Sequence, residues 1–474
     1  MLRFLNTLSG QIETFVPHNR KVRMYVCGPT VYDDSHLGHA RTYILFDSLR
    51  RYLRYRGYEV TYIINLTDID DKIIKRAKEL GESTKAVSDR YASEFFKDMS
   101  ALKVEPADKY PRVSMYIQEI IDVVDILIEK GFAYPVDCDV LFEVSRFERY
   151  GRLSNQSLDQ IRSWSRFESD PRKRDKADFF LWKADPDNGW DSPWGKGRPG
   201  WHIECTVMST NILGEEFEIH GGGTDLIFPH HENEIAQSEV LTGKTFARYW
   251  IHTAFLRIGG NRMGKSEQNF IFVRDALKDY SAETIRHFLV SAHYRSPLDY
   301  NGTSLSDSDS AIRRLNNCLS RIRSYSEFAG SGIDIGNSEI DHATSAMLTD
   351  FGLAMDEDFN TALAMGEIYK MVGLVNRFLA QEKLIHADQV ALGVAYQSLI
   401  EVCMVLGIYT ELESTTNGDT RLVNQLMELV IDIRNDSRLR KDWVMADKVR
   451  DQLHEIGIEL QDTPSGTNWK WEDN

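Results

Sequence analysis

The segment KVRMYVCGPTVYDDSHLGHARTYILFDSLRRYLRYRGYEVTYIINLT occupies residues 21–67 and sets the architecture of the chain. Its pattern predicts a short strand over Lys21–Cys27, then a turn-rich loop and an amphipathic helix over Gly38–Arg56. β-Branched and aromatic residues over Tyr58–Leu66 predict a second strand, and helical periodicity returns from Asp70. This βαβ unit implies a parallel sheet and a nucleotide-binding start.

Beyond this unit the pattern changes twice. Residues 112–195 mix helix, strand and loop and are interpreted as an insertion. Strands and helices alternate again from Gly200, and long helical periodicity takes over after Ser291. The expected fold class is α/β, a Rossmann-type parallel sheet with an insertion, followed by an α-helical C-terminal region. A polar stretch at Ser165–Asp178 interrupts the insertion. Two further polar stretches, at Gly330–Asp341 and Glu411–Asp419, are expected to be exposed linkers.

Composition places the chain among ordinary folded proteins. Its 474 residues exceed the size at which one hydrophobic core stops growing, so two or more domains are expected. Hydrophobic residues make up 42% and charged residues 27%, which excludes disordered and fibrous classes. The formal charge of -16 argues against a protein that coats nucleic acid indiscriminately, although a local basic face can still bind RNA.

Cysteine usage and hydropathy indicate the compartment. The five cysteines are scattered and odd in number, which resembles no disulfide framework and favours a reducing cytosol. The opening MLRFLNTLSGQIETF lacks the apolar core and basic leader of a signal or transit peptide. Apolar runs such as Ile120–Ile128 are interrupted by Asp122 and Asp125 and are too short to cross a bilayer. We therefore expect a cytoplasmic protein without a membrane span.

Two short motifs are suited to binding nucleotide phosphates. HLGH at residues 36–39 stands where the first strand leads into the helix, so two imidazoles and free backbone N–H groups can converge on an anion. RMGKS at 262–266 follows two glycines and is expected on a mobile loop that closes over a triphosphate, with Lys265 stabilising developing charge. Taken alone, HLGH could be only a polar helix start, and RMGKS could be only a solvated basic turn.

Longer motifs in the same order make the chain similar to a known family. They are CGPTVY at 27–32, NLTDIDDK at 65–72, GWHIEC at 200–205, and HGGG at 220–223 with PHHENE at 229–234. Together with HLGH and RMGKS they resemble the cysteinyl branch of the class I aminoacyl-tRNA synthetases, over nearly the whole length. The resemblance implies a cysteine–tRNA ligase that activates L-cysteine with ATP and transfers it to tRNA(Cys) in translation, as a monomer.

The resemblance also implies a division of the chain into functional parts. The catalytic Rossmann domain is expected in two halves, separated by the connective insertion. The parts are 1–111 for the first half, 112–195 for the insertion, 196–255 for the second half, 256–310 for a KMSKS-type loop and stem-contact region, 311–410 for a helical bundle, and 420–474 for an anticodon-recognition region.

A zinc ion (Zn2+) is part of what the resemblance implies. Its ligands would be Cys27, Cys205, His230 and Glu234, two thiolates with a histidine and a glutamate at i, i+4 on a helix. Without the resemblance, the two cysteines fit small buried hydrophobes equally well. Zinc could take the substrate thiol as a thiolate and reject serine and alanine at binding, which makes a proofreading domain unnecessary. A zincin protease is disfavoured because HExxH is absent.

Further site residues follow from the family likeness. Thr67 and Trp201 would line the amino-acid pocket, with loop and core packing as the alternative. A basic and aromatic tail could read an anticodon, although alternating charges on a helix usually form a solvated face. ATP, with magnesium (Mg2+) as counter-ion, would be bound by His36, His39, Gly222, Asp225, Arg262 and Lys265. His36, His39 and Lys265 would be catalytic, and Arg438, Trp443 and Asp462 are the anticodon candidates.

The chain departs from the family's usual KMSKS loop at two positions. Arg262 replaces the first lysine and keeps its charge in a different geometry. Gly264 replaces the serine, which removes a hydroxyl and loosens the backbone. These changes concern loop closure rather than the metal chemistry.

Three other functions compete with this hypothesis. A related ligase transfers the same cysteinyl-adenylate to an amino sugar, but Glu234 and the long helical tail argue against it. An inactive paralogue that only binds tRNA would have lost His36, His39 or Lys265, and all three are present. A structural zinc protein would have no use for phosphate motifs.

Overall fold

The computed structural model describes most of the chain. The described residues are 1–163, 170–264, 268–326, 339–380, 386–409, 427, 429–438, 440, 442–455, 458–463 and 466–471. The chain divides into two compact units, Met1–Tyr409 and Thr410–Asn474. The predicted linker at Glu411–Asp419 lies outside the described residues, as do parts of the polar stretches at Ser165–Asp178 and Gly330–Asp341.

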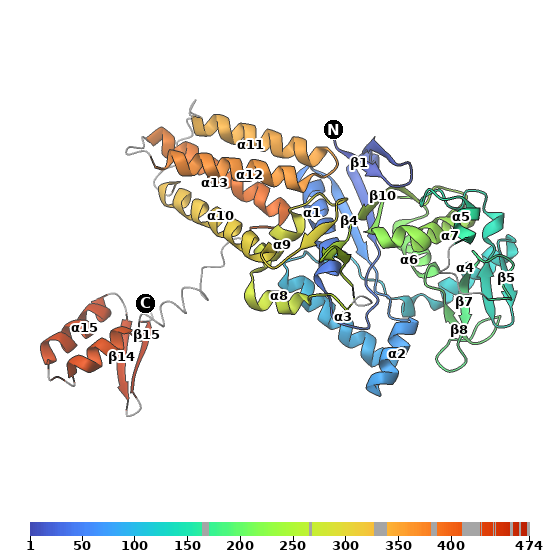
Figure 1. Cartoon of the computed structure of the whole chain (residues 1–474), viewed down its shortest axis with the longest axis horizontal. Coiled ribbons are helices and arrows are strands. Elements are labelled where there is room, and N and C mark those ends of the chain that lie inside the picture. Colours follow the sequence, from blue (N-terminus) through green and yellow to red (C-terminus); the bar gives the residue numbers. More distant parts are fainter. Residues whose placement is uncertain are drawn as a thin grey trace. The chain divides into compact units, whose positions relative to one another are not determined.

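A parallel sheet forms the centre of the first unit (Figure 1). Its strand order is β10-β9-β3-β4, with β3 at Lys21–Val26, β4 at Glu59–Ile64, β9 at Phe217–Gly223 and β10 at Ala247–Thr253. All three pairings are parallel. Helix α1, Leu37–Tyr55, connects β3 to β4. The predicted α/β fold class and the first βαβ unit are therefore confirmed, with boundaries within two residues.

The strand order creates a crevice. From β3 the chain crosses through α1 to β4 on one side, whereas β9, on the other side of β3, comes from the second half of the domain. Connections that leave neighbouring parallel strands in opposite directions open a gap at their carboxyl ends, where ligands of α/β proteins bind. Here that gap lies beyond Val26 and Gly223.

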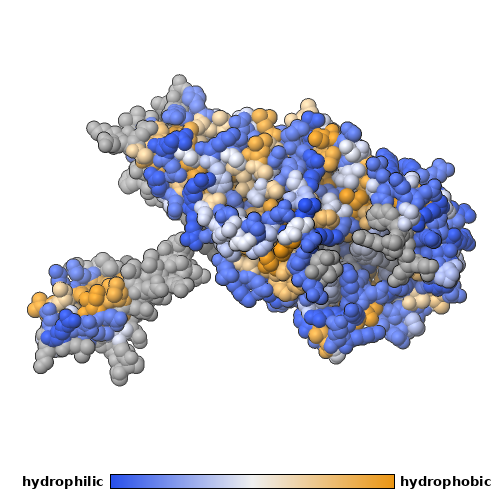
Figure 2. Space-filling view, in the orientation of Figure 1, coloured by the Kyte–Doolittle hydropathy of each residue, from blue (hydrophilic) through white to orange (hydrophobic). Residues whose placement is uncertain are grey.

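The period of two along β3 distributes its side chains between two hydrophobic cores. Val22, Met24 and Val26 face the core shared with α1 and the helical bundle. Tyr25 and Cys27 face the second core, which extends to the insertion. Both faces of the sheet are covered, as parallel sheets require. Figure 2 shows a mostly hydrophilic surface on the visible face, with apolar residues in smaller patches.

The remaining elements surround this sheet. The insertion carries an antiparallel sheet of order β5-β6-β7-β8, and β8 pairs with β7 although it begins two residues beyond the insertion boundary predicted from the sequence. The domain boundaries otherwise stay predictions. Elements before and within the insertion are β1 Arg3–Asn6, β2 Gln11–Thr14, α2 Asp71–Leu80, α3 Thr84–Ala101, α4 Ile117–Glu129, β5 Ala133–Val136, β6 Asp139–Phe142, α5 Leu158–Arg162, β7 Phe179–Ala184 and β8 Gly197–Pro199.

The elements after the insertion complete the site and the helical layer. They are α6 Ile203–Leu213, α7 Glu232–Thr242, β11 Leu256–Ile258, β12 Asn261–Arg262, α8 Val273–Asp279, α9 Ala282–Val290, β13 Leu298–Tyr300, α10 Ser304–Ser326, α11 Glu339–Asp356, α12 Thr361–Phe378 and α13 His386–Leu406. The second unit contains α15 Trp443–Glu455 and the antiparallel hairpin of β14 Ile458–Thr463 and β15 Gly466–Trp471.

Helix α13 carries a longer apolar run than Ile120–Ile128. Its stretch Asp388–Leu406 is, by length and composition alone, able to cross a membrane, and half of it is buried in the structure. It packs against α10, α11 and α1 (Figure 1). Its apolar side chains, including Leu392, Leu399 and Val402, belong to the bundle core.

A buried ion pair joins α9 to α1 and, through Arg286, to the end of α13. Asp47 accepts a hydrogen bond from Arg286 Nη2 at 2.6 Å and another from Arg51 Nε at 2.9 Å. The backbone N–H of Glu105 donates to the same carboxylate at 3.0 Å. Arg286 also donates to the carbonyl of Leu406 at 3.3 Å, where α13 ends. Asp47 and Arg286 are fully buried, so neither charge has water to replace its partner.

Replacing Asp47 by asparagine is expected to lower the free energy of unfolding by about 3–5 kcal/mol, because the Arg286 charge would remain buried without an anion. Urea unfolding followed by circular dichroism measures the change. Lys85→Gln, which removes an exposed pair with Asp89, is the control and should leave the midpoint in place. Equal midpoints for the two variants would contradict the role assigned to the pair.

Candidate active site and metal centre

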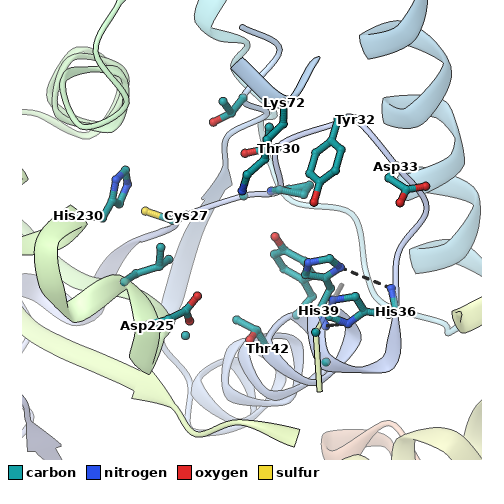
Figure 3. Close-up of a pocket in the computed structure, with 18 of the residues that line it drawn as sticks. Cys27, Thr30, Tyr32, Asp33, His36, His39, Thr42, Lys72, Asp225 and His230 are labelled. Carbon is teal, nitrogen blue, oxygen red and sulfur yellow. Dashed lines mark hydrogen bonds between the residues drawn. The ribbon is translucent and has the colours of Figure 1, made fainter. Parts of the chain in front are cut away.

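A cavity of about 680 Å³ opens at the carboxyl ends of the central strands (Figure 3). It includes the position after β3, the position after β4 and the region after β9. Among the residues predicted from sequence, those that line it are Cys27, His36, His39, Thr67, Trp201, Cys205, Asp225, His230 and Arg262. Residues from distant motifs therefore meet in one pocket.

Four buried side chains converge at the base of this cavity. The thiol of Cys27 lies 3.7 Å from the sulfur of Cys205 and 3.6 Å from Glu234 Oε1. His230 Nε2 lies 3.0 Å from the same carboxylate oxygen. The ligand atoms of all four residues lie within 4.8 Å of one another, so the cluster fits a metal site. These are the four residues that the sequence predicted as ligands.

Local structure places each of the four. Cys27 follows β3 directly, and its N–H donates to the carbonyl of Gly221 on β9 at 3.1 Å. Cys205 lies in the first turn of α6. His230 precedes α7, and Glu234 lies in that helix's first turn, so the i, i+4 spacing puts both side chains on one face.

A second set of donors surrounds Glu234. Cys27, His220, His231 and Glu234 also bring one ligand atom each within 4.8 Å of one another. His220 Nε2 lies 2.7 Å from Glu234 Oε2, the oxygen not directed at His230. His220 and His231 do not line the cavity, whereas Cys27, Cys205 and His230 do. Three of the four residues in the first set therefore line the cavity, whereas Cys27 alone does so in the second set.

Five histidines gather in and behind the cluster. His230 Nδ1 lies 3.0 Å from His202 Nδ1, and His231 Nδ1 lies 2.8 Å from His252 Nε2. In the tautomer that leaves His230 Nε2 available to a metal, Nδ1 is the donor to His202. The neighbours thus orient the ring, as partners behind a metal ligand usually do.

Electrostatics in this cluster favour a cation. Burial disfavours charge on Glu234, but electrostatic attraction and hydrogen bonds from His220 and His230 outweigh it and lower its pKa to about 2. Burial also raises the pKa of Cys27 well above its ordinary value. For Cys205 burial acts in the same direction, yet hydrogen bonds with Cys27 and His230 prevail and bring its pKa to about 6. Burial and hydrogen bonding therefore shift the pKa values of the two thiols in opposite directions, and a bound cation would favour the thiolate form of both.

Thr67 and Trp201 flank the cluster from two sides. The buried hydroxyl of Thr67 donates to Glu204 Oε2 at 2.9 Å. Burial, and next the neighbouring Cys205, raise the pKa of Glu204 well above its usual range. The ring of Trp201 lies 4.4 Å from that of His230, centre to centre, and is 40% exposed. Both residues line the cavity beside the cluster, and their contact with the amino acid stays a prediction.

The HLGH motif forms the start of α1. His36 is the N-cap residue, and its Nδ1 accepts the backbone N–H of His39 at 3.3 Å. The two rings stack with centres 3.7 Å apart. Figure 3 shows both imidazoles on one wall of the cavity, near Thr42. A helix N-terminus with two imidazoles is a ready site for a phosphate.

The RMGKS segment is described up to Gly264. Arg262 Nη2 lies 2.8 Å from Asp225 Oδ2, and its guanidinium carbon lies 4.2 Å from the ring centre of Phe255. Asn269 braces the segment by donating to the carbonyl of Arg262 at 3.0 Å and accepting the N–H of Gly264 at 3.1 Å. The predicted catalytic Lys265 lies outside the described residues.

The predicted adenosine contact of Gly222 meets a different local environment. Gly222 is not among the residues that line the cavity, whereas its neighbour Gly223 is. A Cβ at Gly222 would approach Leu226 to 2.8 Å and His231 to 3.1 Å, so close packing behind the cavity wall accounts for this glycine. Its contact with adenosine therefore stays a prediction.

The anticodon candidates lie in the second unit. Trp443 begins α15 with 56% of its surface exposed, and Arg438 is also exposed. Asp462 lies in β14. Their role stays a prediction.

Sequence reasoning missed several residues of the site. His202, His220 and His231 stood inside the quoted motifs without a role, and His252 stood outside every motif. Lys72 and Lys75 of α2 also line the cavity, although only the first stood in a motif. The first three histidines could have been found from their positions inside the motifs. No sequence feature marked Lys75, because a lysine on an amphipathic helix is usually only solvated.

Comparisons with known proteins agree with this geometry. The family model for the class I (C) tRNA synthetase catalytic domain matches residues 14–310, and the DALR domain model matches residues 350–410. Methionyl-tRNA synthetase of Mycobacterium tuberculosis, solved with methionyl-adenylate, shares the fold with a TM-score of 0.61 at 17% identity, covering 82% of this chain and 90% of that one. The fold and the site are those of a class I aminoacyl-tRNA synthetase.

Relatives over the full length narrow the class. Cysteine–tRNA ligases of Thermococcus onnurineus and Heliobacterium modesticaldum are 47% and 46% identical to this chain, with 99% of each sequence covered. The chain belongs to the cysteine–tRNA ligase family. The resemblance found from the motifs is therefore confirmed.

The purified chain is expected to carry one equivalent of a divalent metal, which elemental analysis measures after dialysis. Cys205→Ser should lower the metal affinity by at least about 100-fold, since it removes a ligand rather than a supporting group. Cys138→Ser, at an exposed cysteine away from the cluster, is the matched control and should retain the metal. Equal metal content in the two variants would contradict the assignment of the ligands.

Proposed function

We propose that this chain activates L-cysteine with ATP to form cysteinyl-adenylate and then transfers the cysteinyl group to tRNA(Cys). The observation that carries the proposal is the convergence of Cys27, Cys205, His230 and Glu234 at the base of a class I synthetase pocket. Full-length relatives named cysteine–tRNA ligases support the same reaction.

Zinc is the metal that best suits the donor set. Two thiolates, one imidazole and one carboxylate are ligands that zinc accepts in a tetrahedron. With Zn–S bonds of about 2.3 Å, the S–S edge of that tetrahedron is about 3.8 Å. The sulfurs of Cys27 and Cys205 are 3.7 Å apart. When bound, zinc supplies a Lewis acid that favours a thiolate over an alcohol and so distinguishes cysteine from serine.

The residues around the cluster would position the amino acid. Trp201 covers His230 at the cavity side and can contact the substrate beside the sulfur. Thr67 is held by Glu204 and also lines the cavity, where it can contact the amino acid. Because cysteine is recognised by direct bonding of its sulfur, a separate proofreading site is not required.

Activation of cysteine by ATP would take place at the wall of the pocket that carries His36 and His39. The carboxylate of cysteine attacks the α-phosphorus of ATP, and pyrophosphate leaves with the electron pair of the broken bond. His36, His39 and Lys265 would stabilise charge on the phosphates, with Mg2+ as counter-ion. Asp225, Gly222 and Arg262 would lie near the adenosine. Catalysis is then mostly positioning and charge stabilisation.

Transfer to RNA completes the reaction. The terminal ribose hydroxyl of the tRNA attacks the acyl carbon, loses its proton and displaces AMP. Arg438, Trp443 and Asp462 in the second unit would contact the anticodon. We propose a cytoplasmic monomer as the working form.

Pyrophosphate exchange into ATP, measured with each amino acid in turn, tests the proposal. Cysteine is expected to support exchange at least about 10⁴-fold better than serine, because serine leaves the sulfur-binding ligand unsatisfied. Cys27→Ala should abolish exchange, while Cys138→Ser should not change it. Exchange that depends on serine, or that persists in Cys27→Ala, would reject the scheme. Charging of tRNA against acylation of an amino sugar then identifies the acceptor.

The altered loop makes a separate prediction. Restoring Lys and Ser at positions 262 and 264 should speed adenylate formation about twofold to fivefold, as the roughly 0.5–1 kcal/mol ordering cost of a glycine implies. Replacing Arg262 by lysine would also remove the contact of its guanidinium with the Phe255 ring and its ion pair with Asp225. Pre-steady-state rates of activation measure the effect. An unchanged rate in the double variant would show that these residues do not limit loop closure.

A further inference from the structure

One wall of the active-site cavity consists of a helix to which the proposed reaction assigns no role. Helix α2 begins shortly after β4, and its spacing of three and four residues puts Lys72, Lys75, Arg76 and Glu79 on the face that lines the cavity. Lys78, on the same helix, does not line it. Figure 3 shows Lys72 entering the cavity beside Thr30 and Tyr32, across from Thr42 and His39.

The two lysines on this face have no anionic partner among the described residues. Within the part of the chain that the structure describes, Lys72 and Lys75 form no ion pair, and the Lys72 ammonium lies 5.5 Å from the centre of the Tyr32 ring. The carboxylate of Asp71 pairs instead with Arg198 and Lys183. Exposed lysines elsewhere in the first unit do pair with carboxylates on their own helix, as Lys85 and Lys97 do.

The third cation of the face is already engaged. Arg76 Nη1 lies 3.3 Å from Glu79 Oε2, and its Nη2 lies 3.3 Å from the hydroxyl of Tyr91. Glu79 is therefore neutralised by Arg76 and does not compete for the lysines. The face presents two ammonium groups on flexible stems backed by a fixed ion pair, an arrangement suited to anions that approach from solvent.

The position of the face distinguishes between the two anionic substrates. The nucleotide phosphates have candidate partners on the opposite wall, at His36, His39 and the RMGKS segment. The chain carries a net charge of -16, so a polyanionic RNA needs local cations where it enters the cavity. Lysine contacts phosphate as a point charge and requires no fixed geometry, which suits a flexible RNA end.

We propose that Lys72 and Lys75 of α2 bind backbone phosphates of the RNA acceptor end as it enters the active-site cavity. The inference rests on the proposed function and adds a binding subsite to it. Its ligand is a phosphate group, and the nucleotide triphosphate is the alternative source of that group.

Charging and activation assays on the same variants test this assignment. Lys72→Gln and Lys75→Gln should each raise the KM for tRNA about threefold to tenfold and lower the salt dependence of tRNA binding by about one unit of log K against log salt. The ratio of the charging rate to the pyrophosphate-exchange rate should fall by the same factor. Lys78→Gln, with the same charge change on the same helix, is the matched control. Lys72→Arg, which keeps the positive charge, should bind tRNA as well as the unsubstituted chain does.

Two outcomes would overturn the proposal. An equal loss of exchange and charging would assign the lysines to the triphosphate instead of RNA. An unchanged KM for tRNA and an unchanged salt dependence in the variant carrying both substitutions would show that the face binds no phosphate. Absence of cysteine-dependent exchange in the unsubstituted chain would instead reject the proposed function, so the two failures are distinguishable.

Discussion

The site depends on one electrostatic constraint, which is that several groups able to carry negative charge are buried within a few ångströms of one another. Cys27, Cys205 and Glu234 cannot all be anions at these distances unless a cation lies among them. His220 and His230 compensate Glu234 in part, and the thiol of Cys27 donates to the sulfur of Cys205. The protein can remove this conflict by binding a metal, and the same metal can then select a substrate by its sulfur.

The surrounding fold keeps these groups in place from three directions. The pairing of β3 with β9 puts Cys27 next to Gly221, and α6 and α7 bring in the other three side chains. Arg286 of α9 forms a buried pair with Asp47 of α1 and also donates to the end of α13, so the HLGH motif stands on a helix anchored further along its length. Motions that would shift α1 away from α9 are therefore opposed by buried charge as well as by apolar packing.

The two walls of the cavity differ in how they bind anions. The wall with His36 and His39 is built from a capped helix start and stacked rings, which gives a fixed geometry suited to a reacting phosphate. The wall formed by α2 offers Lys72 and Lys75, which form no ion pair within the described part of the chain. This arrangement suits a ligand that must enter and leave. An acidic chain can thus bind RNA where needed without attracting nucleic acid elsewhere.

The sequence by itself determined the first βαβ unit, because local periodicity and turn residues define strands and helices directly. It also indicated the family, since the motifs stand in a characteristic order, and through that resemblance it named the four residues that cluster as candidate ligands. Only the tertiary structure decided which of the 13 histidines surround Glu234, that Gly222 is needed for packing, and that Lys72 and Lys75 face the cavity. The physical reason is that these contacts join residues far apart in the sequence. Cys27 and Cys205 are 178 residues apart, and their contact exists only after strand pairing and helix packing have brought distant segments together.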